Sequence, residues 1–511
     1  MTCSYLGCEP GIGGNLWRLG ALQHGGVNYA TSHFRGPPQF ESANSMNEEF
    51  VRRIDARLIL SVVACGIMSF SGVVVETAMN ITFPSLMGEF DIDTATVQWV
   101  TTGYLLVLTA IMPLSSFLKR RFRNKALFAA AICCFTVGTV TCAVAPVFSL
   151  LIAGRLVQGI GTGLALPLMF NIVIEQAPFS KMGLMMGIAT LITATAPAVG
   201  PSVGGLIVTL WGWRQIFLVL LPFLALSAVA GFASLRQVSE TEHVSFSIPQ
   251  FIMLSGAFVC LVFASSSASS AGWLSAQVLG LLLAGIVLAV AFVFLSQRSA
   301  NPLIHVDIFR SKSFSASVLY VVLLQAIVLG LGYLLPYYGQ VVNGQDEFGA
   351  GCLLLPGCII GAILAPLGGR ILDVFGARRP LTFGSLCQLA AIVLYAMVCI
   401  GAEPWLFTLV YVLIPISQGF SAANSITNGL SYLPTDRKTD GNATFNTLQQ
   451  LGGALGTAAM TSIVNASQSQ ASSLVAGTIA GTQTAFYVLL GVSLAAICAM
   501  AAVFAGRRRS R

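Results

Sequence analysis

The chain has 511 residues, of which 56% are hydrophobic and 9% charged, and its mean hydropathy is +0.82. Soluble globular proteins carry about 25% charged residues, so this chain lacks the polar residues needed to coat a water-exposed surface. The net charge of +7 does not indicate nucleic-acid binding, because the basic residues lie at the ends of apolar runs, where they orient helices in a membrane.

The first 50 residues differ from the rest of the chain. They are polar, rich in Gly, Ser and Asn, and contain no apolar core of a secretory signal peptide. This composition predicts disorder, and we expect 1–54 to form a disordered cytoplasmic extension. Met46 precedes Asn47-Glu48-Glu49 and is itself a plausible start, so whether 1–45 are translated is left open. Mass spectrometry of the native N-terminus decides between the two starts.

Apolar runs of twenty or more residues recur beyond this extension, and each is long enough to cross a hydrocarbon layer of roughly 30 Å as a helix. We therefore predict an all-α polytopic membrane protein. The predicted spans are 58–85, 97–118, 126–145, 147–171, 184–209, 215–235, 249–268, 273–296, 316–338, 348–371, 380–401, 405–430, 441–464 and 483–506. Two of these spans include many small or polar residues: 249–268 runs into a Ser/Ala tract, and 441–464 is rich in Gly and Gln. Long outside loops are expected only at 339–348 and 464–482.

Basic residues gather in one set of alternating loops. If the N-terminus is cytoplasmic, the outside loops carry only Arg214. The inside loops and tail then carry Lys119, Arg120, Arg121, Arg123, Lys125, Lys181, Arg236, Arg298, Arg310, Lys312, Arg370, Arg378, Arg379, Arg437, Lys438, Arg507, Arg508, Arg509 and Arg511. The positive-inside rule therefore places both termini in the cytoplasm. An even number of spans independently requires both termini on one side.

Only two ionisable residues lie deep in the predicted spans, Glu76 on the first and Arg155 on the fourth. A charge at this depth costs at least about 2.5–3.5 kcal/mol on insertion scales, so each needs a partner or a function. Both lie roughly 13 Å below the outer boundary, and their charges are opposite, so they either pair or face one cavity. We interpret them as a proton-coupling pair; the alternative is a static ion pair that fixes helix packing.

Polar residues near the pair are consistent with a lined cavity. Asn80 lies one turn beyond Glu76, and Gln158 lies at i+3 from Arg155 on the same helix face. Ordinary interhelical hydrogen bonding explains these side chains equally well. Gln325, Tyr333 and Asn424 are further candidates for the substrate cavity.

No enzyme constellation is present in the sequence. The four histidines, His24, His33, His243 and His305, lie outside the predicted spans without ligand spacing, and no Gly-Lys-Ser/Thr follows a glycine-rich loop. Ten of the twelve cysteines lie in apolar runs, where Cys behaves as a small hydrophobe. We therefore expect no enzyme activity, no metal site, no disulfide framework and no ATP-driven transport.

Helix breakers and glycines gather on the fourth and fifth predicted spans. Gly159, Gly161 and Gly163 permit close helix approach, and the stretch from Pro197 to Gly205 places prolines at membrane depth. Broken or closely packed helices mark moving interfaces in transporters. The composition therefore indicates a moving interface, although small residues also occur in static ones.

Six segments share a family pattern. They are Glu76-Thr77-Ala78-Met79-Asn80-Ile81-Thr82-Phe83-Pro84, Gln98-Trp99-Val100-Thr101-Thr102-Gly103-Tyr104, Gly154-Arg155-Leu156-Val157-Gln158-Gly159, Pro197-Ala198-Val199-Gly200-Pro201-Ser202-Val203-Gly204-Gly205, Pro302-Leu303-Ile304 and Asn446-Thr447-Leu448-Gln449-Gln450. Together they resemble the fourteen-span drug:proton antiporter branch of the major facilitator superfamily, over roughly 55–505. The commoner pattern of the first segment has Asp where this chain has Val75. The Glu form is similar to a lincomycin-resistance-like subgroup of multidrug efflux proteins.

The resemblance implies roles for particular residues. Arg155 matches an arginine implicated in proton coupling, and Pro197, Gly200, Pro201, Gly204 and Gly205 match the motif that separates exporters from uptake carriers. The family loop Gly-x-x-x-Asp-x-x-Gly-x-Arg is degenerate at 113–122, which keeps basic charge but lacks the Asp. Its second copy retains Gly369, Asp373, Gly376 and Arg378, so the cytoplasmic gate is assigned to that copy.

The fold implied is the major facilitator fold with 14 transmembrane helices, two six-helix bundles plus two extra helices. The expected domains are the N-terminal bundle 55–236, the additional pair 237–300, the C-terminal bundle 301–507 and a basic cytoplasmic tail 508–511. The expected function is proton-coupled export of small amphipathic molecules across the cytoplasmic membrane, without another cofactor and by a monomer. Two alternatives are a dedicated exporter of a metabolite, lipid or amino acid, and a non-transporting membrane sensor or scaffold.

Overall fold

The computed structural model describes residues 54–505 except 93, 98, 242–245, 300–301, 400 and 402. The described residues belong to one compact unit within 49–511, and none of them lies in a strand. Almost all of the predicted N-terminal extension, the tail 508–511 and the motif residue Gln98 lie outside the described part of the chain.

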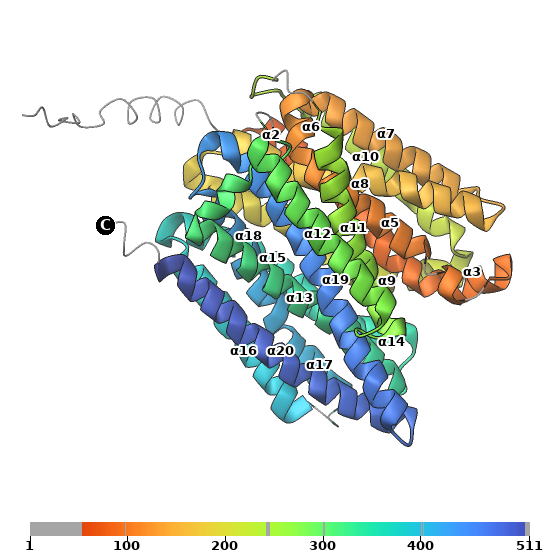
Figure 1. Cartoon of the computed structure of the whole chain (residues 1–511). Helices are drawn as coiled ribbons and strands as arrows, with labels where there is room; N and C mark the ends of the chain where they lie inside the picture. Colours follow the sequence, from red (N-terminus) through yellow and green to blue (C-terminus); the bar gives the residue numbers. More distant parts are fainter. Residues whose placement is uncertain are drawn as a thin grey trace, which may run out of the picture. The chain divides into compact units, whose positions relative to one another are not determined.

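The first group of helices runs from residue 56 to residue 234 (Figure 1). Its helices are α2 (Ala56–Ala78), α3 (Phe83–Phe90), α4 (Thr94–Val97), α5 (Trp99–Ile111), α6 (Ser115–Arg121), α7 (Asn124–Ala143), α8 (Phe148–Gln176), α9 (Met182–Trp211) and α10 (Arg214–Ser234), with 3₁₀ turns η1 (Met79–Thr82), η2 (Met112–Leu114) and η3 (Phe179–Lys181). Within this group α2 packs on α8, α9 and α10, while α7 and α5 pack on α8.

The remaining helices form an extra pair and a second group. The pair is α11 (Ile248–Ala271) and α12 (Ala276–Arg298). The second group comprises the 3₁₀ turns η4 (Val306–Arg310) and η6 (Thr435–Arg437), the π-helical turn η5 (Tyr395–Cys399) and the helices α13 (Lys312–Val341), α14 (Glu347–Cys352), α15 (Leu355–Phe375), α16 (Arg378–Leu394), α17 (Pro404–Tyr411), α18 (Leu413–Leu430), α19 (Lys438–Gln470) and α20 (Leu474–Ala505). In it α13 packs on α18, α19 and α20, and α18 packs on α15 and α16.

Local sequence explains where several helices begin and bend. Asp55, Ser275 and Ser311 cap α2, α12 and α13, because their side chains accept a backbone N–H of the first turn. Pro113 lies in the 3₁₀ turn that separates α5 from α6, since proline has no N–H to donate to a continuing helix.

Thirteen helices in the described part of the chain are long and apolar enough to cross a membrane. The remaining predicted span, 441–464, corresponds to α19, which has 33 residues but is too polar to meet the same criterion. The predicted loop at 464–482 is wrong, because α19 extends to Gln470 and α20 begins at Leu474. Small and polar residues there continue both helices beyond their apolar cores, which hydropathy alone does not detect.

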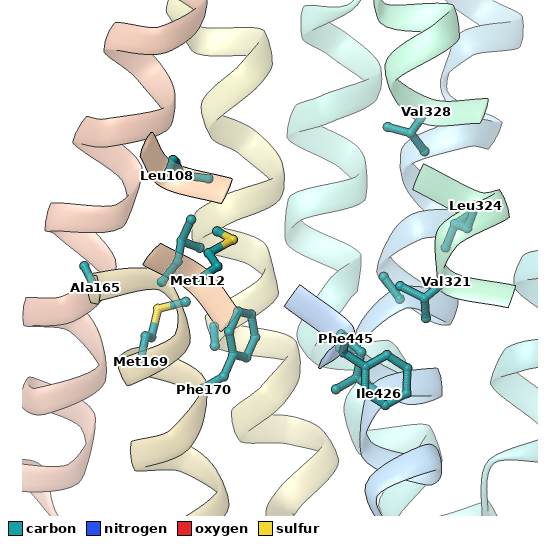
Figure 2. Packing of buried hydrophobic residues seen from close by; sticks show 14 of the residues in the cluster. Leu108, Met112, Ala165, Met169, Phe170, Val321, Leu324, Val328, Ile426 and Phe445 are labelled. Atoms are coloured by element: carbon teal, nitrogen blue, oxygen red, sulfur yellow. The ribbon is translucent and has the colours of Figure 1, made fainter. Parts of the chain in front are cut away.

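The apolar core continues through both groups of helices. Figure 2 shows Leu108, Met112, Ala165, Met169 and Phe170 from α5, η2 and α8 on one side, and Val321, Leu324, Val328, Ile426 and Phe445 from α13, α18 and α19 on the other. The extra helix α11 packs against both α5 and α19, and α12 is the least buried of the apolar helices. The exposed apolar surface of α12 is what contact with lipid requires.

An ion pair joins α3 to the start of α10. Arg214 Nη2 lies 2.6 Å from Oε1 of Glu89, and Trp213 Nε1 donates to Oε2 of the same carboxylate at 2.7 Å. The hydrogen bond from Arg214 is the main cause that lowers the pKa of Glu89. The ion pair therefore stabilises the fold above the unfolded pKa of about 4.3, and its contribution is lost as pH falls through the lower folded pKa.

We expect Glu89→Gln to lower the melting temperature slightly at pH 7. Both partners are more than a third exposed, so the loss should be less than about 1 kcal/mol. Thermal melting of the detergent-purified protein measures the difference. It should shrink as the pH falls below 4, and a difference that grows with acid contradicts the assignment.

Candidate functional site

The two intramembrane charges lie on helices that pack together, α2 and α8. Arg155 is fully buried, whereas Glu76 is partly exposed. They interact electrostatically, yet no N–O distance within 4.0 Å joins them in the described part of the chain. A direct ion pair, the form that the static alternative requires, is therefore absent from this conformation.

Several neighbours hold the Arg155 guanidinium in place. Nε donates to the carbonyl of Val100 at 3.1 Å, Nη1 donates to Gln158 Oε1 at 2.8 Å, and the guanidinium carbon lies 4.2 Å from the centre of the Tyr104 ring. Nη2 has no hydrogen-bond partner among the described residues. A buried cation with one unpartnered N–H group is oriented to bind an anionic group.

A hydrogen-bond chain extends from this arginine across four helices. Gln158 Nε2 donates to Thr139 Oγ1 of α7 at 2.7 Å, and the Tyr104 hydroxyl lies 3.1 Å from the Gly72 carbonyl of α2. Tyr104 also contacts the hydroxyl of Thr162 at 2.9 Å. Because Gly72 lies one turn before Glu76, movement of α2 is linked to the Arg155 environment through Tyr104.

We expect Tyr104→Phe to destabilise the protein by about 1 kcal/mol, the scale of one interhelical hydrogen bond in a membrane protein. The ring that covers Arg155 remains, so expression should be retained. Tyr104→Leu removes the cation–π contact as well and should cost about 1 kcal/mol more. Thermal melting of both variants in one detergent measures the two steps, and equal melting temperatures contradict a role for the ring.

The proline- and glycine-rich motif lies on α9 and faces α2. The sequence indicated either a broken helix or a closely packed one. The helix continues through Pro197 and Pro201, so the motif forms a closely packed helix. A Cβ at Gly200 would meet Thr77 and the Val74 carbonyl, and one at Gly204 would meet Ala78 at 2.6 Å. The motif glycines thus bring α9 directly against the Glu76 turn of α2. Gly205 has more space, with Ile81 at 3.8 Å from the same position.

The predicted cavity residues of the second group do not gather with Glu76. Gln325 of α13 accepts a hydrogen bond from Gln449 of α19 at 3.1 Å, and Tyr333 stacks on Tyr337 with ring centres 5.4 Å apart. Asn424 is fully buried and donates to the Gly368 carbonyl of α15 at 3.0 Å, which makes it a helix-packing contact. The side chain of Asn80 lies outside the described residues.

The two groups meet closely where α9 begins. We call this end of the helices the basic end, because basic residues lie at the helix ends there: Arg120 and Arg121 in the last turn of α6, Arg370 near the end of α15 and Arg378 at the start of α16. Asp373 of α15 accepts the backbone N–H groups of Gly183 and Leu184 of α9, at 2.8 and 3.0 Å. Two free N–H groups at a helix start bind a carboxylate well.

Glycines permit this contact. Gly369 lies against the Gly183 backbone, and Gly376 ends α15 at a φ of +77° that favours glycine. The fourth predicted gate residue, Arg378, is exposed at the start of α16.

Sequence reasoning missed two buried charges at the basic end, Lys119 and Asp440. Lys119 pairs with Glu175 at 2.6 Å, and Asp440 contacts Ser116 and His305. Asp440 was assigned to a loop because the predicted span began one residue later, at 441. The polar run after it, Asn442 and Asn446, was the available signal that this helix start is buried.

Comparison with known proteins places the chain in a family. Residues 65–457 match the model of the Major Facilitator Superfamily. The lincomycin resistance protein LmrB of Listeria monocytogenes is 34% identical over 444 residues, covering 85% of this chain and 94% of the relative. LmrB of Bacillus subtilis is 35% identical over 401 residues, 78% of this chain and 84% of the relative. The tetracenomycin C resistance and export protein of Streptomyces glaucescens is 28% identical over 409 residues, 78% and 74% of the two chains.

Solved structures support the same fold. The human organic anion transporter MFSD10 aligns with a TM-score of 0.61 at 13% identity, covering 86% of this chain and 99% of that chain. The proton:xylose symporter XylE aligns with a TM-score of 0.59 at 14% identity, covering 85% and 94%. The likeness at these identities concerns the fold alone. From the matched model, the relatives and the helical architecture together, this chain belongs to the major facilitator superfamily of membrane transporters.

Proposed function

We propose that the chain is a proton-coupled antiporter that exports small amphipathic molecules, including drugs, across the cytoplasmic membrane. The observation that carries this proposal is the partly exposed Glu76 beside the fully buried Arg155. Ionisable groups at membrane depth mark proton or ion pathways in transporters. The relatives named for lincomycin resistance and tetracenomycin C export support the direction and the substrate class.

The proposed cycle uses the packing of α2 and α9. Glu76 takes up a proton from the outside, which removes its attraction to Arg155 and lets α2 shift against the glycines of α9. The substrate binds near the midplane between the two groups, and rocking of one group against the other exposes it alternately to each side. Gln325, Tyr333 and Gln158 are proposed to contribute polar and aromatic contacts to the substrate.

The remaining assignments follow from this mechanism. The proton is the coupling ion and no other cofactor is required, so the chain is a transporter without enzyme activity of its own. Its partners are the substrate and the lipid bilayer, with no nucleic acid, and a monomer suffices. The basic end faces the cytoplasm together with both termini, as the charge distribution favours.

Inside-out membrane vesicles test the proposal directly. An acidic lumen should drive accumulation of lincomycin or of a fluorescent amphipathic dye, and an uncoupler should abolish it. Vesicles from cells that lack the protein give the background. Accumulation that ignores the imposed pH gradient contradicts proton coupling.

Two other outcomes distinguish the alternatives. A dedicated exporter should confer no resistance to a broad cytotoxin panel in a deletion strain, yet transport one compound under the same gradient. A sensor or scaffold should transport nothing and should function normally as Arg155→Ala. Competition between unlabelled compounds in proteoliposomes then identifies the substrate class.

A further inference from the structure

Asp440 is a buried carboxylate at the basic end, in the first turn of α19. Its side chain is only 2% exposed. The positive end of a helix dipole favours a carboxylate there, but a buried charge also needs hydrogen bonds. In the described part of the chain, the bonds of this carboxylate go to other segments, not to the N–H groups of its own helix.

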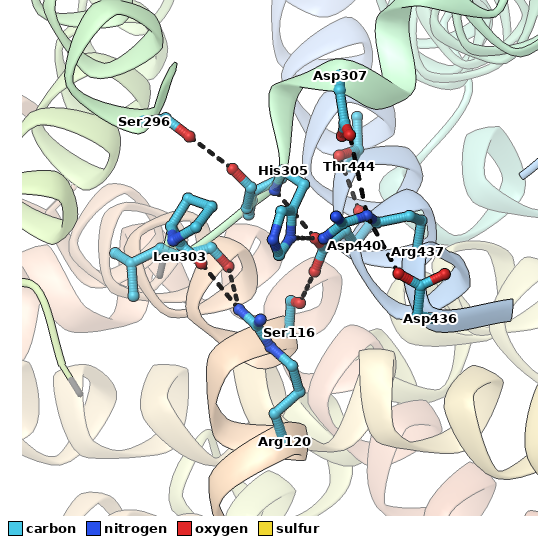
Figure 3. Close-up of polar contacts among 12 residues, drawn as sticks. Ser116, Arg120, Ser296, Leu303, His305, Asp307, Asp436, Arg437, Asp440 and Thr444 are labelled. Atoms are coloured by element: carbon cyan, nitrogen blue, oxygen red, sulfur yellow. Dashed lines mark hydrogen bonds and ion pairs between the residues drawn. The ribbon is translucent and has the colours of Figure 1, made fainter. Parts of the chain in front are cut away.

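Ser116 and His305 provide those bonds (Figure 3). The Ser116 hydroxyl donates to Oδ1, while the backbone N–H of His305 donates to Oδ2 at 2.9 Å. The ring Nδ1 of His305 lies 2.6 Å from the same Oδ2. A carboxylate only accepts, so Nδ1 carries the proton. Both carboxylate oxygens of Asp440 are thereby satisfied.

The three residues come from three different parts of the molecule. Ser116 belongs to α6 of the first group, Asp440 to α19 of the second, and His305 to the connector between α12 and α13. The connector is itself held on both sides. Arg120 Nη2 donates to the carbonyls of Pro302 and Leu303 at 2.9 and 3.2 Å, and the Leu303 N–H donates to Gln250 of α11 at 2.8 Å.

This contact resembles the Asp373 contact, but the carboxylate and its hydrogen-bond donor have exchanged helices. In the Asp373 contact, α15 is the second long helix of the second group and α9 is the fifth of the first group. In the Asp440 contact, α5–α6 is the second long helix of the first group and α19 is the fifth of the second group. In one contact the carboxylate belongs to the second helix, as Asp373. In the other it belongs to the fifth helix, as Asp440, and the second helix contributes the hydroxyl of Ser116.

Neighbouring residues of α19 extend the same interface. Asn442 Nδ2 donates to Asn171 Oδ1 of α8 at 2.8 Å, and the Lys438 ammonium lies 5.2 Å from the centre of the Phe179 ring. The first turns of α19 therefore bind the first group through Lys438, Asp440 and Asn442. The buried carboxylate is the strongest of these contacts, because hydrogen bonds to a charged group exceed neutral ones.

We propose that Ser116, His305 and Asp440 form a latch that closes the basic end of the transporter. The degenerate loop at 113–122 thus retains a gate, with its carboxylate supplied by the opposite group of helices. The extra pair α11–α12 gains a function, because its connector delivers His305 to the latch. The gating role rests on the proposed transport function, whereas the contact itself does not.

Hydrogen exchange measured by mass spectrometry tests the latch on the full chain in nanodiscs, without substrate or gradient. Asp440→Asn should speed exchange about tenfold in the segments 438–447 and 115–121, as loss of a hydrogen bond to a charged group predicts. Ser116→Ala should have a smaller effect on the same two segments. The matched control is Asp436→Asn, which changes a 69% exposed carboxylate and should alter neither segment.

A double variant tests whether the carboxylate can lie on either side of the contact. Ser116→Asp with Asp440→Ser moves the carboxylate to the other side and should exchange more like the wild type than like Asp440→Asn. Exchange in the double variant that is closer to that of Asp440→Asn overturns the proposed latch. So does exchange that rises only within 438–447 in Asp440→Asn and nowhere in Ser116→Ala. Because no transport is measured, a failed latch and a failed export function are distinguishable.

Discussion

Glu76→Gln should abolish substrate accumulation driven by a pH gradient, with a loss of about a hundredfold in initial rate, the scale on which an essential acid–base group acts. The amide keeps the size and polarity of the side chain but cannot bind and release a proton. Exchange of labelled for unlabelled substrate, which needs no net proton movement, should persist. Inside-out vesicles measure both activities on the same preparation.

Two matched variants accompany this experiment. Glu89→Gln makes the same chemical change on α3, outside the Arg155 environment, and should retain gradient-driven transport. Glu76→Asp keeps a carboxyl group and should retain part of it. Unchanged accumulation in Glu76→Gln contradicts the proton-coupling role of Glu76. Loss of substrate exchange in the same variant indicates that Glu76 takes part in substrate binding.

Gly369→Ala should lower transport by about tenfold although alanine favours helix over glycine by about 1 kcal/mol. The added Cβ would meet the carbonyl of Gly183 and lie 2.9 Å from the Leu184 nitrogen. The two groups must then separate at the basic end and weaken the Asp373 contact, at a cost of about 1–3 kcal/mol for overpacking. Initial transport rates and hydrogen exchange in 182–187 measure the two effects.

Gly280→Ala is the matched control for this change. Gly280 lies on α12, where an added Cβ meets nothing within 4 Å, so transport and exchange should stay at wild-type values. A Gly369→Ala variant that transports normally shows that close approach of Gly183 and Gly369 is not needed for the cycle.

Much of the fold was predictable because it depends on composition along the chain. Long apolar runs required helices, while the orientation predicted from the alternation of basic loops stays a prediction. The helix ends were less predictable, since residues such as those at 464–482 are polar enough to leave the membrane and still continue a helix. The polar helix α19 was among the least supported of the predicted spans, because its Gly- and Gln-rich sequence has low hydropathy.

The candidate site was predictable only where a charge was unusual for its surroundings. Glu76 and Arg155 were conspicuous in apolar helices, and the comparison with relatives leaves their roles to experiment. Asp440 and His305 were not conspicuous, because each lies beside a helix end where charged residues are common. Only the packing of α6, α19 and the connector buries Asp440 and brings His305 against it, and packing between distant segments is not encoded in local sequence.

The polarity of α19 has a consequence for how the protein enters the membrane. Insertion of a helix as it leaves the ribosome depends on its own hydrophobicity, and α19 carries Asp440, Asn442, Asn446 and Gln449 with few long apolar residues. Its burial against α11, α13 and α20 means that partners made before and after it must shelter it. Stable insertion of α19 therefore depends on the order in which its neighbours are synthesised, and α19 should be retained in the bilayer only once α20 has emerged.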